Sequence, residues 1–312
     1  MKEKIITFLK KIWNNKTTQK IISIGSILFS VSILGWLIFS QWDLLQVYLV
    51  NIRFEFLGIS FIVYSLILLI TSGIWAQIMN VIGHKSSFAV HFYAFCISAL
   101  GKRLPGTLWY VAWRANIYQD EDHSSNLVIL TSGIEMIAIV LSATIVSIVF
   151  AIPLINQFKY SLIGFALVLV TVFLFMIPKV NQWIFKKLKV DFEKFSYKNT
   201  AFWTLEYIIV WLLNGVLLFS IANIFGNFNI SDLGYFIGAL SLTGVLSRIF
   251  LFLPSNFGFN EVSLSLLLSG IMPSSLAVIV ALSNRIIIIL FETIWALVAI
   301  AIRRLSRRIN PN

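Results

Sequence analysis

Six apolar stretches in this 312-residue chain are long enough, or nearly long enough, to cross a lipid bilayer as helices. A bilayer core about 30 Å thick requires roughly 20 apolar residues per helix. The stretches lie at about residues 21–40, 56–79, 124–151, 161–177, 200–225 and 275–302. The sequence therefore predicts an all-α polytopic integral membrane protein.

Composition excludes an ordinary soluble domain, because 59% of the residues are hydrophobic, only 12% are charged and the mean hydropathy is +0.90. The net charge of +11 lies in blocks between apolar stretches, where it indicates topology and not nucleic-acid binding. The single cysteine, Cys96, excludes an intramolecular disulfide and a thiolate metal cluster. We expect no metal, no cofactor and no nucleic-acid partner.

Lys and Arg residues predict the orientation, because cytoplasmic loops carry an excess of them. Six Lys precede the first apolar stretch, six lie within residues 178–199, and four Arg follow residue 302. Both termini should therefore be cytoplasmic, which requires an even number of crossings. We expect a basic N-terminus at 1–20, one transmembrane domain at 21–302 and a basic tail at 303–312, in the cell membrane. The first stretch lacks a cleavage pattern and should remain as an uncleaved span.

Two further apolar regions, 88–113 and 233–270, are interrupted by the segments GKRLPG and LPSNFG. If each region enters and leaves on one side, the chain has six full transmembrane helices plus two broken or re-entrant elements. One element would then enter from the cytoplasm and the other from outside, as in an inverted repeat whose broken helices form a site near the midplane. Alternatively, the regions are ordinary or kinked spans, which gives eight or more. Hydropathy alone does not distinguish re-entrant elements from ordinary or kinked spans.

The first interruption combines helix-breaking residues with positive charge. Pro105 lacks an N–H group and Gly106 tolerates positive φ, so a helix ending near them leaves backbone groups unpaired. Lys102, Arg103 and Arg114 flank this break and supply donors suited to phosphate. The alternative is that these bases only mark the cytoplasmic interface beside a turn.

The second interruption lies within a stretch, residues 248–292, that carries two Glu and two Arg in an otherwise apolar run. Charges at membrane depth are costly, so their presence favours a polar cavity. Gly258 interrupts the run, and Glu261 stands where a helix would begin again, close to the positive end of its dipole.

Arg285 and Glu292 are seven residues apart and therefore share one face of the last predicted span, although they are about 10 Å apart along it. Their partners must come from other elements. We expect Glu261 to pair with Arg285, and Arg248 or Arg114 to pair with Glu292. The alternative to a ligand site is a buried structural ion pair.

Three other groups of polar residues have simpler interpretations. Glu135 lies about eleven residues into a predicted span and could face a cavity or carry a proton, whereas Glu206 is nearer a cytoplasmic end. Asp120–His123 could ligate a divalent ion, but acidic residues followed by Ser124 and Ser125 are typical of a helix N-terminus. We favour capping. Each of the three His should have a structural role.

The sequence contains no G-x-x-x-x-G-K-[ST], G-x-S-x-G or H-E-x-x-H motif. The chain is therefore not expected to use ATP through a P-loop or to act as a hydrolase or metalloprotease. We expect a protein that is not an enzyme.

Taken together, the two interruptions resemble the membrane domain of the lysylphosphatidylglycerol synthase family, which also occurs as stand-alone flippase-like proteins. The first family motif is Leu-Pro-Gly followed by an Arg, matched by Leu104, Pro105, Gly106 and Arg114. The second is Pro, a Gly-containing turn, Glu, an apolar helix with Gly, and Arg, matched by Pro254, Gly258, Glu261, Gly270 and Arg285. The chain ends at Asn312, so we expect no soluble aminoacyl-transfer domain and no synthesis of lysyl-lipid.

The resemblance implies translocation of a lipid with a phosphate-containing headgroup, such as aminoacyl-phosphatidylglycerol or a polyprenyl-linked sugar. Arg114 and Arg285 would hold phosphate, and Glu261 would orient Arg285 or meet an amine. Membrane lipids are the expected partners. Two alternatives remain: a membrane transferase acting on lipid-linked sugars, supported only by Asp120–His123, and a non-catalytic membrane partner of a glycosyltransferase or lipid synthase.

Overall fold

The computed structural model describes residues 52–82, 86–102, 109–119, 124–151, 197–249 and 258–309, with residues 39, 42, 43 and 46. In these ranges the secondary structure is helical, and no strand occurs among them. Most of the predicted spans 21–40 and 161–177 lie outside the described residues. So do Arg103, Pro105, Gly106 and Asp120–His123.

Four long helices fall where the hydropathy predicted them. They are α4 (Phe54–Ile82), α7 (Ser125–Phe150), α11 (Tyr197–Phe225) and α14 (Ser274–Ile309). A fifth segment long and apolar enough to cross a membrane joins the 3-10 turn η2 (Ile230–Asp232) to α12 (Leu233–Ile249). Of the two interpretations of this region, one arm of a broken element or an ordinary span, its length and composition fit a span. With these five candidate spans, the described part of the chain is a multi-pass helical membrane protein.

Three helices are shorter than a membrane span. They are α5 (Phe88–Gly101), α6 (Trp109–Gln119) and α13 (Phe259–Leu268). At 1.5 Å per residue, they are only about 15–21 Å long, against a bilayer core of about 30 Å. The predicted breaks therefore separate α5 from α6 and α12 from α13. In each case the two arms pack against one another.

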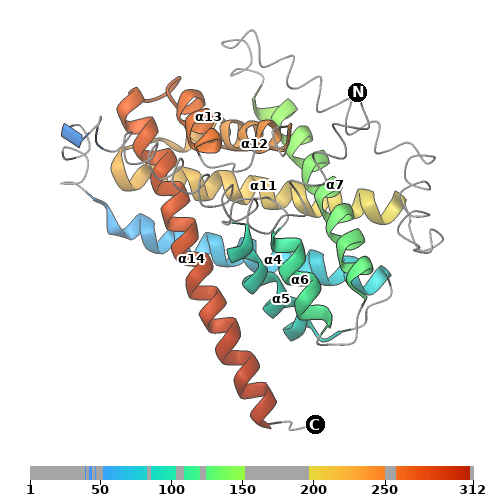
Figure 1. The fold of residues 1–312 in the computed structure, drawn as a ribbon. Helices are drawn as coiled ribbons and strands as arrows, with labels where there is room; N and C mark the ends of the chain where they lie inside the picture. Colours follow the sequence, from blue (N-terminus) through green and yellow to red (C-terminus); the bar gives the residue numbers. More distant parts are fainter. Residues whose placement is uncertain are drawn as a thin grey trace, which may run out of the picture.

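Helices α4 and α11 pack antiparallel through the middle of the molecule (Figure 1). At one end Arg53 N–H donates to the Ile224 carbonyl over 3.1 Å, and at the other Gln77 donates to the Glu206 carboxylate over 2.9 Å. Between them Ser60 and Ser220 bond across the contact at 3.0 Å. In Figure 1, α12 and α13 lie on one side of this pair and α5 and α6 on the other.

Helix α14 packs against both short-helix pairs, because it contacts α5 as well as α13. Its C-terminal end projects beyond the other helices in Figure 1. Helix α7 has a similar position, since it contacts α6 and α12. Gly238 on α12 lies so close to the end of α7 that an added Cβ would come within 2.5 Å of the Phe150 carbonyl oxygen.

The expected capping at the start of α7 is only partly correct. Ser124 occupies the N-cap position, but its side chain makes no capping hydrogen bond. The neighbouring Ser125 hydroxyl instead accepts a hydrogen bond from the Gln119 amide at the end of α6. Ser125 therefore ties α6 to α7.

Candidate functional site

The charged residues singled out inside apolar segments form two ion pairs, and each pair joins a short helix to a long one. Arg114 on α6 pairs with Glu135 on α7. Glu261 on α13 pairs with Arg285 on α14, as the sequence predicted. Of the two cations that we expected as partners for Glu292, Arg248 or Arg114, Arg114 pairs with another carboxylate because α6 packs against α7.

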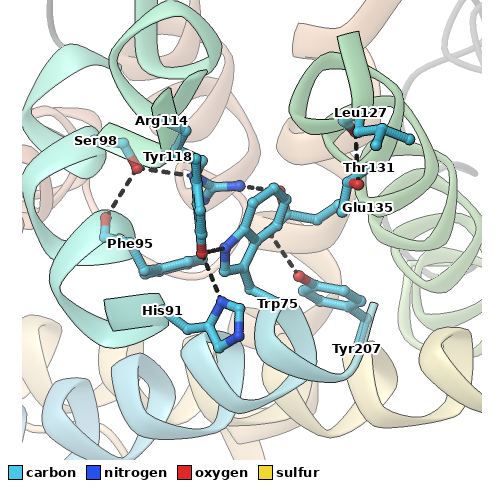
Figure 2. A network of polar contacts seen from close by, with 10 residues as sticks. All are labelled: Trp75, His91, Phe95, Ser98, Arg114, Tyr118, Leu127, Thr131, Glu135 and Tyr207. Atoms are coloured by element: carbon cyan, nitrogen blue, oxygen red, sulfur yellow. Dashed lines mark hydrogen bonds and ion pairs between the residues drawn. The ribbon is translucent and has the colours of Figure 1, made fainter. Parts of the chain in front are cut away.

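The first pair lies at the centre of a buried polar network (Figure 2). Arg114 is 0% exposed, and its Nη1 lies 2.5 Å from Glu135 Oε2. Its Nε donates to Ser98 Oγ on α5 over 2.8 Å, while the Tyr207 hydroxyl on α11 donates to Glu135 Oε1 over 3.0 Å. These bonds connect four helices and satisfy both carboxylate oxygens, as buried charges require.

Three aromatic rings enclose the Arg114 guanidinium. Its Cζ lies 4.0 Å from the ring centre of Trp75, 4.7 Å from that of Phe95 and 5.3 Å from that of Tyr110. Such cation–π contacts stabilise a desolvated guanidinium. Arg114 is therefore held in a closed, aromatic environment in this conformation, without exposure to a headgroup.

A second chain of hydrogen bonds runs beside Arg114. Trp75 Nε1 donates to the Tyr118 hydroxyl over 2.8 Å, and that hydroxyl lies 2.6 Å from His91 Nδ1. Because the Tyr118 oxygen accepts from Trp75, its own proton is available to His91 Nδ1. His91 is fully buried, so this contact lies inside the helical body. Sequence reasoning did not identify Trp75, Tyr118 or Tyr207, since each lies in an apolar run with no local motif.

The second pair is built on the N-terminus of α13. Gly258 has φ of 88°, a conformation that residues with a Cβ rarely adopt, and this places its N–H 2.8 Å from Glu261 Oε2. Glu261 Oε1 accepts a hydrogen bond from Arg285 Nη1. Both carboxylate oxygens are therefore engaged, and the predicted roles of Gly258 and Glu261 at the helix start agree with this geometry.

A pocket of about 230 Å³ opens beside the Glu261–Arg285 pair, among α11, α12, α13 and α14. Five uncharged polar side chains contribute to its wall: Asn214, Thr243, Ser247, Asn260 and Asn284. The other lining residues are Trp211, Leu240, Gly244, Leu264, Ala281 and Ile288. An ion pair and several amides within apolar helices make this pocket the stronger candidate for a ligand site.

Two lining oxygens have unused hydrogen-bonding capacity. The side-chain oxygens of Asn260 and Asn284 are buried and have no hydrogen-bond partner among the described residues. Each Asn directly precedes one member of the ion pair, Glu261 or Arg285. Neither Asn was predicted as a site residue, although their positions beside intramembrane charges were an available signal.

The remaining predicted residues lie apart from the pocket lining. Glu292 is buried on α14, Arg248 is partly buried at the end of α12, and Lys102 is exposed at the end of α5. Lys102 Nζ lies over the rings of Phe95 and Tyr110 at 5.2 and 5.5 Å, close to the aromatic enclosure of Arg114. Within the described ranges, no group of three or more His, Cys, Asp or Glu side chains could hold a metal ion.

The fold and these two sites define a class, a multi-pass helical membrane protein with paired charges inside its helical body. No protein-family model and no curated protein matches the chain.

Proposed function

We propose that this protein translocates lipids, and that the pocket beside Glu261 and Arg285 receives a polar headgroup while the hydrocarbon tails stay in the bilayer. The pocket itself is the observation that carries the proposal. It is lined by an ion pair and five uncharged polar side chains, lies among α11, α12, α13 and α14, and adjoins the break between α12 and α13. Polar sites at broken helices are typical of transport proteins.

The two Arg residues have different roles in this proposal. Arg285 adjoins the pocket and can meet a headgroup directly. Arg114 is enclosed by aromatic rings, so it can meet a headgroup only after α6 moves relative to α4 and α5. In the present conformation, Arg114 and Glu135 hold the first short-helix pair against the long helices.

We further propose that the chain contains an inverted repeat, with α4 to α7 equivalent to α11 to α14. Each half has the same order: a 29-residue helix, two helices on either side of a Leu-Pro break, and a long helix. The first helices of the halves, α4 and α11, pack antiparallel, as inversion requires. This supports an arrangement in which the broken elements enter from opposite sides.

Contacts between the halves are also reciprocal. The second helix of each half packs against the last helix of the other, α5 against α14 and α12 against α7. The α12–α7 contact is antiparallel, because Gly238 adjoins Phe150 and Val245 clusters with Ala143. In the α5–α14 contact, Phe92 packs edge-on against Trp295 and Tyr93 lies under Arg303. Reciprocal pairing of this kind favours twofold symmetry over coincidental packing.

The ion pairs follow the same symmetry with their charges exchanged. The first pair has Arg on the short helix and Glu on the long one, and the second pair has the reverse. Pro105 and Pro254 are 149 residues apart (254 minus 105), and the same offset takes Glu135 to position 284, next to Arg285.

On this proposal the protein has six full spans and two re-entrant pairs of helices, and both termini are on the cytoplasmic side of the cell membrane. Among the described residues, nothing favours a transferase or a scaffold instead.

Purified protein in liposomes is expected to move headgroup-labelled phosphatidylglycerol or a polyprenyl-linked sugar between leaflets. Transfer is measured as the fraction of label that an impermeant quencher reaches over time, in proteoliposomes and in protein-free vesicles of the same lipid. Exchange at least tenfold faster with protein is the expected result. Equal rates for every lipid tried, with the protein shown to be folded, would contradict translocation.

Single cysteines at the two breaks test the inverted arrangement. In a Cys96→Ser background, Thr107→Cys should react with an impermeant maleimide from the cytoplasmic side, and Phe257→Cys from the external side, because the two breaks are approached from opposite faces. Inside-out and right-side-out vesicles separate the two results. Reaction of both cysteines from one face would contradict the inverted repeat without affecting the transport assay.

A further inference from the structure

We infer that the group entering the α11–α14 pocket is uncharged and rich in hydroxyls, a polyol or sugar unit, and that the pocket does not hold phosphate. This inference rests on the proposed function, since it names what part of the lipid this same pocket receives. It revises the expectation that Arg285 would hold phosphate.

The charge balance of the pocket disfavours an anion. Arg285 and Glu261 are the charged residues among the described lining, and they neutralise each other. Both Glu261 oxygens are engaged, one by Arg285 and the other by the Gly258 N–H group. A phosphate at Arg285 would compete with Glu261 for the same positive charge and would leave the pocket with a net negative charge.

Three uncharged lining residues each use a side-chain donor on a backbone carbonyl of their own helix. Thr243 donates its hydroxyl proton to the Ala239 carbonyl over 2.8 Å, and Ser247 donates to the Gly244 carbonyl over 2.9 Å. Asn214 likewise uses its amide nitrogen on the Val210 carbonyl over 2.8 Å. Each of these three side chains therefore retains oxygen lone pairs and has already used a donor.

The two remaining amides point to the same requirement. The side-chain oxygens of Asn260 and Asn284 are buried without a partner in the described part of the chain. Buried acceptors without donors are costly, so a ligand that supplies O–H or N–H groups is favoured. An ammonium would bring an uncompensated positive charge into a neutral pocket, whereas hydroxyls bring donors without charge.

The size and remaining walls of the pocket fit one small headgroup unit. A volume of about 230 Å³ corresponds to about seven or eight waters at roughly 30 Å³ each, too little for a whole lipid. Trp211 uses its indole N–H on the Ile139 carbonyl at 3.2 Å, so its ring forms an apolar wall. Gly244 permits this position, because a Cβ there would lie 2.2 Å from the ring.

Lipid binding to the full-length protein tests the inference independently of transport. The protein is kept in a polyoxyethylene detergent, because a maltoside would itself supply hydroxyls, and binding is measured by native mass spectrometry. Four lipids with identical acyl chains are compared: glucosyl-diacylglycerol, phosphatidylglycerol, phosphatidic acid and phosphatidylethanolamine. The two hydroxyl-bearing lipids should bind at least tenfold more tightly than phosphatidic acid. Equal or tighter binding of phosphatidic acid, or a preference for phosphatidylethanolamine, would overturn the inference.

Substitutions at Asn260 and Asn284 separate acceptor from donor recognition. Asn→Leu at either position should abolish the preference for hydroxyl-bearing lipids. Asn→Asp should retain it, because Asp keeps the acceptor oxygens, while its negative charge in place of the N–H donors further disfavours an anion. Loss of the preference in both Asp variants, with unchanged melting temperature, would instead indicate that the amides donate to an anion. Asn126→Leu, an exposed position on α7, is the matched control.

Methyl glucoside, which carries hydroxyls but no lipid tail, tests whether the pocket binds a lipid headgroup or a free sugar. It is added as a competitor in the same binding measurement. Competition only by the tailed lipids supports both the inference and the proposed function. Tight binding of methyl glucoside alone would support a hydroxyl site and contradict a lipid ligand. Selective lipid binding combined with no leaflet exchange in vesicles would retain the inference and contradict translocation.

Discussion

Glu135→Leu is expected to lower the free energy of unfolding by about 3–5 kcal/mol, the usual cost of leaving one partner of a buried ion pair uncompensated. Arg114 would keep its bond to Ser98 and its aromatic neighbours but lose its carboxylate, and Tyr207 would lose its acceptor. Unfolding is measured by denaturing-detergent titration in mixed micelles, with helicity as the signal.

The matched control is the double substitution Arg114→Met with Glu135→Leu, which removes both charges at similar volume. Because no lone buried charge remains, the double variant should be markedly more stable than Glu135→Leu alone. Tyr207→Phe should cost only about 1 kcal/mol, since it removes one hydrogen bond. If the single and double substitutions destabilise equally, Arg114 and Glu135 do not stabilise each other in the way described.

Arg285→Ala is expected to reduce leaflet exchange at least tenfold. Removal of the guanidinium leaves Glu261 buried with only the Gly258 N–H as its partner, so the start of α13 loses its attachment to α14 and the pocket loses one wall. Glu261→Gln should reduce exchange as well, because the amide retains hydrogen bonding but leaves Arg285 without its counter-charge. Exchange is measured with labelled phosphatidylglycerol at matched protein content.

Arg53→Ala is the matched control for that loss. Arg53 pairs with Glu55 at the exposed start of α4, outside the pocket, so the same change of residue type should leave exchange unaltered. Melting temperature and monodispersity are recorded for every variant, so that a folding defect is distinguished from a transport defect.

Helix positions were the most predictable part of this protein, because the bilayer imposes the same length on every span. The expected stretches at 56–79, 124–151 and 200–225 agree with α4, α7 and α11 to within three residues at each end. The last helix continues past the predicted end at 302, through the basic residues that were assigned to the tail. Hydropathy alone left open whether the region beginning at 233 spans the membrane, and η2 lengthens α12 at its start into a candidate span at Ile230–Arg248.

The two ion pairs show what local sequence can and cannot predict. Glu261 and Arg285 were predicted as partners because both are rare charges beside one break, on successive helices. Glu135 was identified as a buried carboxylate, but its partners were not, because Tyr207 lies 72 residues away and its contact depends on how α7 meets α11. The pocket oxygens of Asn260 and Asn284 were missed because amides in a helix carry no charge signal.

The central claim is that a headgroup crosses the membrane through the α11–α14 pocket. Its most direct test is the rate of phosphatidylglycerol exchange in proteoliposomes containing the wild-type protein, Arg285→Ala or Arg53→Ala, against protein-free vesicles. The predicted result is fast exchange for wild type and Arg53→Ala, and exchange near the protein-free rate for Arg285→Ala. Wild-type exchange in folded Arg285→Ala protein would contradict the assignment of this pocket.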